Sequence, residues 1–166
     1  MSYALKRLSH GNLAAALAKA SHYRDLNQPE EAESICRDVL DVEANNQEAW
    51  KLLGLALTDR LQTGQVGLLE EAIEALEHLT DEYERVYHVG IAWERAAKAH
   101  LERSEAHSAV TSFEHALRLF EQAEKMRPEL PDPVLRWNRC VRLLSNHPSL
   151  RAAIHAPRED NVPLGD

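Results

Sequence analysis

The sequence is poor in residues that interrupt helices, and it has no run that favours strands. It contains only 6 Gly and 7 Pro, and three of the prolines come after residue 147. A half-buried strand would require a sustained alternation of β-branched and polar residues, which is missing. Ala, Leu, Glu, Arg and Gln supply much of the remainder, and all are good helix formers. The composition therefore predicts an all-α protein.

Long apolar runs and an excess of basic residues are also missing. No apolar stretch approaches the roughly 18 residues that a membrane span needs, and residues 1–7 contain no apolar core of a signal peptide. The formal net charge is −8, whereas binding to phosphate groups needs a basic face. The two cysteines, Cys36 and Cys140, make no disulfide or metal framework. We therefore expect a cytoplasmic protein that binds neither membranes nor nucleic acid.

Motifs of catalysis are missing too. The chain has no Gly-rich phosphate loop, no G-x-S-x-G elbow and no H-E-x-x-H helix. Three of the nine histidines, His100, His107 and His115, are close in sequence, but they are seven or eight residues apart. That spacing is two helical turns, too long for one helix to hold one metal with both. We expect no enzymatic activity, no cofactor and no metal. A metal-dependent regulator or enzyme that uses this histidine-rich segment is the less favoured alternative.

What the sequence does contain is a recurring pattern of apolar and small residues. Trp50-x2-Leu53-Gly54-x2-Leu57 has the spacing W-x2-L-G-x2-Y, with Leu in place of the final aromatic residue. The same frame returns from Val86, and weaker forms begin at Ala16 and Val134. A second spacing, Ala followed four residues later by a larger side chain, begins at Ala32, Ala72 and Ala116. This pattern resembles the tetratricopeptide repeat, a helix–turn–helix unit of about 34 residues. The small residues would let the two helices of each hairpin approach closely.

The resemblance implies a right-handed superhelix of helical hairpins, with about three and a half repeats. Ala16 and Trp50 are 34 residues apart, but Val86 and Val134 are 48 apart. The extra residues contain no Gly or Pro, so we expect an elongated third hairpin that projects beyond its neighbours. A smaller insertion at 62–67 indicates a loop. We expect repeat helices at 12–26, 28–43, 47–62, 68–80, 82–105, 108–127 and 132–145, and a short helix at 149–154.

Helix-capping signals support this division. Asn27, Asn45 and Asp81 each precede a Glu by three residues, a spacing typical of a helix start. Asp132 directly precedes Pro133, which suits a cap followed by proline at the first helical position. We therefore divide the chain into an N-terminal segment (1–11), a helical repeat domain (12–148), and a short helix with a disordered tail (149–166).

In the tetratricopeptide family the first helix of each hairpin lines a concave groove that holds a peptide or a helix. The resemblance thus implies a non-catalytic scaffold or adaptor for a protein partner. The corresponding groove residues are Arg24, Lys51, Leu55, Tyr87, Ile91, Arg95 and Arg139. A small secretion or assembly chaperone of this type is an alternative. Homodimerisation through an apolar edge at Val134, Trp137 and Val141 is also open.

Two further features bear on the partner. Some family members hold a terminal carboxylate with Lys, Asn and Arg, but the corresponding positions here are Leu17, Ser21, Leu52, Glu84 and His88. That clamp is absent. Arg136, Arg139 and Arg142 recur at three-residue steps on the last repeat helix. They could pair with acidic residues of a partner, or they could form the solvated outer side that a terminal repeat needs.

Overall fold

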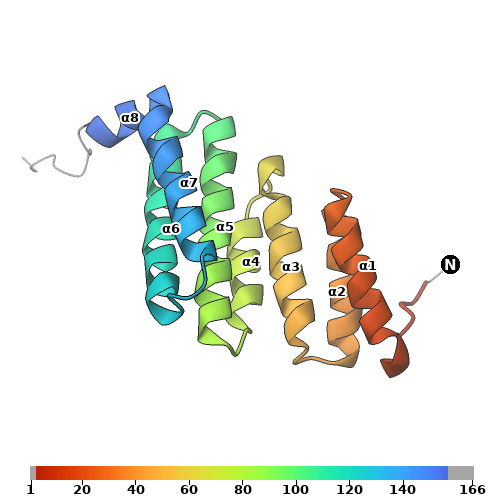
Figure 1. Cartoon of the computed structure of the whole chain (residues 1–166). Helices are drawn as coiled ribbons and strands as arrows, with labels where there is room; N and C mark the ends of the chain where they lie inside the picture. Colours follow the sequence, from red (N-terminus) through yellow and green to blue (C-terminus); the bar gives the residue numbers. More distant parts are fainter. Residues whose placement is uncertain (1–2, 157–166) are drawn as a thin grey trace, which may run out of the picture.

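A computed structural model describes residues 3–156, and helices follow one another along nearly all of this range (Figure 1). Within it the chain forms eight α-helices, two short 3-10 helices and no strand. The α-helices are α1 (Leu13–Asp25), α2 (Pro29–Val42), α3 (Gln47–Asp59), α4 (Leu68–Glu77), α5 (Glu82–Glu102), α6 (Ala106–Met126), α7 (Asp132–Asn146) and α8 (Pro148–His155). The 3-10 helices are η1 (His10–Asn12) and η2 (Leu61–Thr63).

The all-α class is confirmed for the described range, and every expected helix is present with ends within three residues of the prediction. The disordered tail predicted for residues 157–166 lies outside the described residues. In the part of the chain that the structure covers, every helix is too short or too polar to cross a bilayer.

Helices adjacent in sequence pack against one another, from α1 at one end of the molecule to α8 at the other (Figure 1). Helices two apart also touch: α1 contacts α3, α3 contacts α5, and α6 contacts α8. The buried side chains form clusters between these helices, and Leu57, Leu76, Phe113 and Phe120 are among the largest that are fully buried. The core is thus distributed along the row of helices.

In each of two successive hairpins, a glycine allows the two helices to approach each other closely. A Cβ atom on Gly54 of α3 would lie 2.5 Å from Leu76 Cγ of α4. A Cβ on Gly90 of α5 would lie 2.8 Å from Phe120 Cε1 of α6. Both distances are far below van der Waals contact, so only glycine fits without movement of the neighbouring helix. The expected role of the small residues is therefore confirmed at these two positions.

The hairpin of α5 and α6 is elongated as predicted, because each helix has 21 residues whereas α3 has 13. Its extra turns do not stand free, however. η2 contacts α5, and Arg103 after α5 donates a hydrogen bond to the Leu61 carbonyl oxygen at 3.4 Å. α8 packs against α6 and α7 with Leu150 fully buried. The elongated hairpin is thus braced on both sides.

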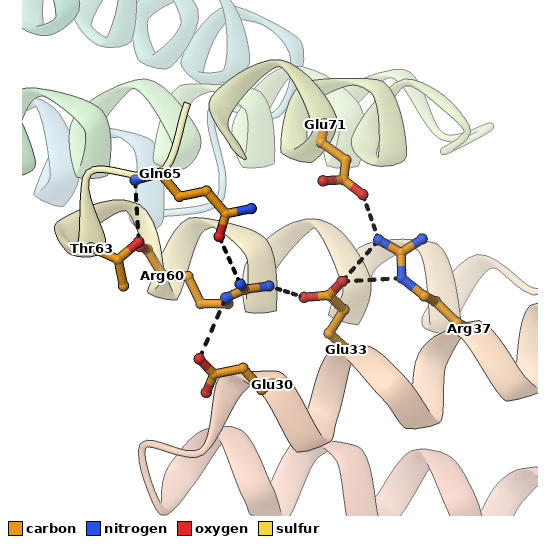
Figure 2. A network of polar contacts seen from close by, with 7 residues as sticks. All are labelled: Glu30, Glu33, Arg37, Arg60, Thr63, Gln65 and Glu71. Atoms are coloured by element: carbon orange, nitrogen blue, oxygen red, sulfur yellow. Dashed lines mark hydrogen bonds and ion pairs between the residues drawn. The ribbon is translucent and has the colours of Figure 1, made fainter. Parts of the chain in front are cut away.

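The connection between α3 and α4 is held by a network of ion pairs and hydrogen bonds (Figure 2). Arg60, just after α3, pairs with Glu33 of α2 and donates a hydrogen bond to Gln65 at 3.0 Å. Glu33 also accepts from Arg37 at 2.9 Å, and Arg37 reaches Glu71 of α4. The predicted loop at 62–67 overlaps η2 and contains two glycines with positive φ, and this network fixes it against α2 and α4.

The positions of the helix starts were predicted correctly, but only some of the capping residues were. Asp81 accepts a hydrogen bond from the Glu84 backbone N–H at 2.9 Å, as expected. At α3 the cap is Asn46, whose side chain accepts from Ala49 N–H, and not Asn45. Asn27 was wrong as a cap: it has φ 57 and follows the end of α1, a left-handed position that asparagine tolerates.

At α7 the predicted capping residue is itself helical. The helix begins at Asp132, the preceding residue Pro131 occupies the cap position, and Pro133 lies in the first turn. The assignment of Asp132 as the cap was therefore wrong by one residue. A proline is tolerated in the first turn because its missing N–H would have no partner within the helix.

Candidate functional site

The residues predicted to bind a partner all lie on the odd-numbered helices. They are Arg24 in α1, Lys51 and Leu55 in α3, Tyr87, Ile91 and Arg95 in α5, and Arg139 in α7. Contacts of α1 with α3 and of α3 with α5, and an ion pair from α5 to α7, connect these helices in sequence. We call this surface the odd-helix face. It comprises the seven predicted residues and the polar side chains next to them: Asp59, Glu84, His88, Glu94, Lys98 and Arg136.

One carboxylate on this face is shared by two guanidinium groups from different helices. Arg24 Nε donates to Asp59 Oδ2 at 2.8 Å, and Arg95 Nη1 donates to Asp59 Oδ1 at 2.5 Å. Arg95 also donates to Thr58 Oγ1 and to the Leu55 carbonyl oxygen. Burial lowers the pKa of Arg95 from its usual value, and Asp59 opposes that shift. The cluster joins α1, α3 and α5 and holds both arginines in fixed positions.

A second cluster lies near the start of α5. Lys51 Nζ is 3.4 Å from Glu84 Oε2, so this ion pair joins α3 to α5. His88 Nδ1 lies 2.7 Å from the Glu84 carbonyl oxygen, and since a carbonyl only accepts, the imidazole donates this bond. Burial lowers the pKa of His88 below its usual 6.5, against the opposing effect of Glu84. His88 is therefore neutral at physiological pH.

The third cluster surrounds a glutamate with no exposed surface. Glu94 of α5 is 0% exposed and pairs with Lys98, one turn later, and with Arg136 Nη1 of α7 at 2.9 Å. Arg139 Nε lies 4.0 Å from Glu94 Oε1. Burial by itself would raise the pKa of Glu94, but Lys98 and Arg136 outweigh burial and lower it. Glu94 is thus a buried anion balanced by three nearby cations.

The predicted apolar residues of the face serve mainly in packing. Ile91 is buried in the cluster that includes Phe113 and Phe120, and Leu55 and Tyr87 pack against the same cluster. The Tyr87 ring centroid is 6.0 Å from that of Phe120. Leu135 of α7, by contrast, is 63% exposed. The accessible part of the face therefore consists of charged side chains with Leu135 nearby, and whether these residues bind a partner stays a prediction.

The predicted set omitted two cations that the structure places on this face, Lys98 and Arg136. Lys98 follows Glu94 by four residues, a spacing that indicates an ion pair along one helix, so the sequence contained a signal for it. The pairing of Arg136 with Glu94 joins residues 42 positions apart. No local pattern predicts that contact, because it depends on how α7 packs beside α5.

The histidines and cysteines do not assemble into a reactive centre in residues 3–156. No group of three or more His, Cys, Asp or Glu side chains in this range is placed to hold a metal. His115 stacks on Trp93 at 4.3 Å, and His100 pairs with Glu105. Cys36 and Cys140 are free and buried, and burial raises the pKa of each thiol to about 12. Neither thiol is poised to act as a nucleophile.

None of the residues that line one hollow of the described structure belongs to the odd-helix face. This hollow has a volume of about 380 Å³ and lies between α6 and α7, lined by Glu114, Leu117, Arg118, Glu121 and Trp137. Trp137 is half-buried there, while Val134 and Val141 of the expected apolar edge are about one-third exposed. Another hollow, of about 230 Å³, lies at the connection between α3 and α4.

No protein-family model matches the chain, and no curated protein matches it significantly. Its function is therefore inferred from the arrangement of its own residues.

Proposed function

We propose that this protein is a non-catalytic interaction module that holds a peptide or a helix of a protein partner on the odd-helix face. The proposal includes a tetratricopeptide-like superhelix of about three and a half repeats: α1–α2, α3–α4, the elongated hairpin α5–α6, and α7. The close approach at Gly54 and Gly90 supports the repeat, because both glycines lie in the same sequence frame of successive hairpins.

The observation that carries the proposal is the row of ion-pair clusters across four helices. Asp59 and Glu94 each pair with cations from two helices, and Glu84 pairs with Lys51 of α3, so the long cationic side chains are held in place before a partner arrives. Side chains that are already ordered lose less conformational entropy on binding. A surface of fixed polar groups across several helices therefore suits recognition of an extended segment.

A cytoplasmic location is part of the proposal. Both cysteines are free and buried, which fits a reducing compartment, where structural disulfides are rare.

The test is affinity capture from native cell extract with charge-reversal variants chosen for exposure. Arg24 and Arg95 are unsuitable, because replacing both by Glu would place three carboxylates together at Asp59. Lys51→Glu/Arg139→Glu changes two accessible cations of the odd-helix face. The matched control is Lys125→Glu/Arg151→Glu, with the same charge change on α6 and α8. Lys125 resembles Lys51 in having one carboxylate at 3.4 Å.

We expect the intact protein and the control to retain the same partner and the odd-helix variant to lose it, with unchanged helical circular dichroism in all three. Equal recovery of the partner by both variants would place the binding surface elsewhere and contradict the proposal.

A further inference from the structure

We propose that the part of the odd-helix face around Glu94 binds an acidic segment of a protein partner, with carboxylates of the segment contacting Lys98, Arg136 and Arg139. This inference rests on the proposed function and names the chemistry of the partner. It follows from an excess of positive charge at this place in a chain whose net charge is −8.

The excess arises because the one carboxylate of the cluster is hidden. Glu94 is 0% exposed, whereas the side chains of Lys98, Arg136 and Arg139 are 27%, 30% and 64% exposed. A molecule approaching the face therefore meets three cationic heads and no carboxylate of this cluster. The anion beneath them fixes their positions but neutralises only one of the three charges.

Arg139 retains the most capacity for a new contact. Its Nε lies 4.0 Å from Glu94 Oε1, too far for a hydrogen bond, and most of its side chain is exposed. A guanidinium carries five N–H donors in a planar fork that matches a carboxylate with two parallel bonds. Arg142 lies three residues further along α7 and is also exposed, so a second carboxylate could be met one turn away.

The neighbouring clusters extend the same charge pattern. Asp59 is shared by Arg24 and Arg95, so one negative charge again faces two positive charges. Arg95 is close enough to Arg24 and Arg136 for both to lower its pKa, after the larger effect of burial. Ion pairs with Asp59 and Glu94 thus link the cationic groups of α1, α5 and α7.

The face favours a peptide over a nucleic acid. Binding of a nucleic acid gains most of its affinity from an extended basic surface, whereas here the carboxylates of Asp59, Glu84 and Glu94 alternate with the cations. Leu135 precedes Arg139 by one helical turn and is 63% exposed, so it offers an apolar contact beside the cations. A segment with carboxylates next to a Leu-like side chain satisfies both features.

The probe is a synthetic, fluorescein-labelled peptide of repeated Glu-Glu-Leu, compared with Gln-Gln-Leu of the same length by fluorescence anisotropy. We expect the protein to bind the Glu peptide and not the Gln peptide, and binding to weaken as salt is raised to about 0.15 M. Arg139→Glu/Arg142→Glu should weaken binding by at least about tenfold, since two contacts become repulsive. Lys98 and Arg136 still hold Glu94 in this variant, so its fold is retained. The exposed Arg151→Glu on α8 is the control and should leave the affinity unchanged.

Four results would overturn the inference: no binding of the Glu peptide, equal binding of the Gln peptide, equal affinity of the Arg139→Glu/Arg142→Glu variant, or tighter binding of a single-stranded oligonucleotide with the same number of charges. The proposed function is judged separately. If the Glu peptide fails while Lys51→Glu/Arg139→Glu still loses the partner captured from cells, the interaction module stands and only the acidic segment is wrong.

Discussion

At the scale of single residues, Gly90 shows how one missing side chain determines the distance between two helices. Its Cα faces the Phe120 ring, and an added Cβ would be 2.8 Å from Cε1 and 3.3 Å from Leu119 Cβ. Phe120 is fully buried, so its ring has little room to move. Gly54 has the same relation to Leu76 in the preceding hairpin.

We expect Gly90→Ala to lower the free energy of unfolding by about 1–3 kcal/mol, the usual cost of overpacking a core. This loss exceeds the gain of about 1 kcal/mol from replacing glycine inside a helix. Urea denaturation measures the difference. Gly11→Ala is the control, because a Cβ at Gly11 meets nothing within 4 Å. A Gly90→Ala protein as stable as the control would show that α5 and α6 can separate at little cost.

His88 and Glu94 make stability fall on acidification. The folded-state pKa of His88 is depressed, chiefly by burial, so the unfolded chain takes up the proton first as the pH falls through 6.5. Glu94 also has a lowered folded-state pKa, so its contribution is present above 4.5 and is lost below that pH. The two groups change the stability in separate pH ranges, and the range of His88 is the higher one.

We therefore predict that the urea midpoint of the wild-type protein decreases between about pH 7.5 and about pH 5.5, and that His88→Gln reduces this decrease. His107→Gln, a substitution at an exposed histidine, is the matched control and should retain the wild-type dependence. The same pH dependence in His88→Gln and wild type would assign the effect to other groups.

The roles of Gly54 and Gly90 could be predicted from their place in a recurring frame, because close packing of helices leaves a residue-type signature. The capping residue at α3 could not be chosen from sequence, since Asn45 and Asn46 are equally suitable caps and only the chain path into the helix selects Asn46. Burial of Glu94 could not be predicted either. A glutamate on a helix face is usually solvated, and its cover comes from α7, 42 residues away.

At the scale of elements, the connection between α3 and α4 is anchored through its first residue, Arg60. Arg60 bridges Glu33 of α2 and Gln65 of the connection, with only 17% of its side chain exposed (Figure 2). Partly buried, charge-assisted bonds of this kind contribute more than exposed ion pairs.

Replacing Arg60 by Met should therefore lower the free energy of unfolding by about 1–3 kcal/mol. Lys125→Met removes an exposed ion pair with Glu121 within α6 and should cost less than about 0.5 kcal/mol. Chemical denaturation of both variants tests this difference. Equal, small losses would mean that the bonds of Arg60 with Glu33 and Gln65 contribute no more than solvated ones.

Helix positions were predictable at this scale because helix formers, small residues and a spacing near 34 residues all indicate the same boundaries. The length of α5 and α6 followed from an insertion free of Gly and Pro. The contacts that brace these two helices could not be predicted, because α5 with η2 and α6 with α8 are segments that no repeat spacing in the sequence connects.

At the scale of the whole molecule, net charge and the charge of the odd-helix face have opposite signs. The chain carries −8 formal charges with neutral histidines, while most cations of the face surround carboxylates that are partly or fully buried. The excess negative charge therefore lies mostly outside the odd-helix face. It would repel an acidic partner from the rest of the surface and so favour approach to this face.

Protonation of the nine histidines would offset the entire net charge, so we expect a solubility minimum near the sequence pI of about 5.6. Light scattering across the range from pH 7.5 to about pH 5 measures it. Unchanged solubility across this range would show that local charge pairing outweighs net charge.

The central claim, that a partner lies on the odd-helix face, is tested most directly by site-specific photocrosslinking in cells. A photoreactive residue would replace Lys51 on the odd-helix face, and the same residue would replace Lys125 on α6 in a second protein. The account predicts one crosslinked partner from position 51 and none from position 125. A crosslink from position 125 without one from position 51 would contradict it.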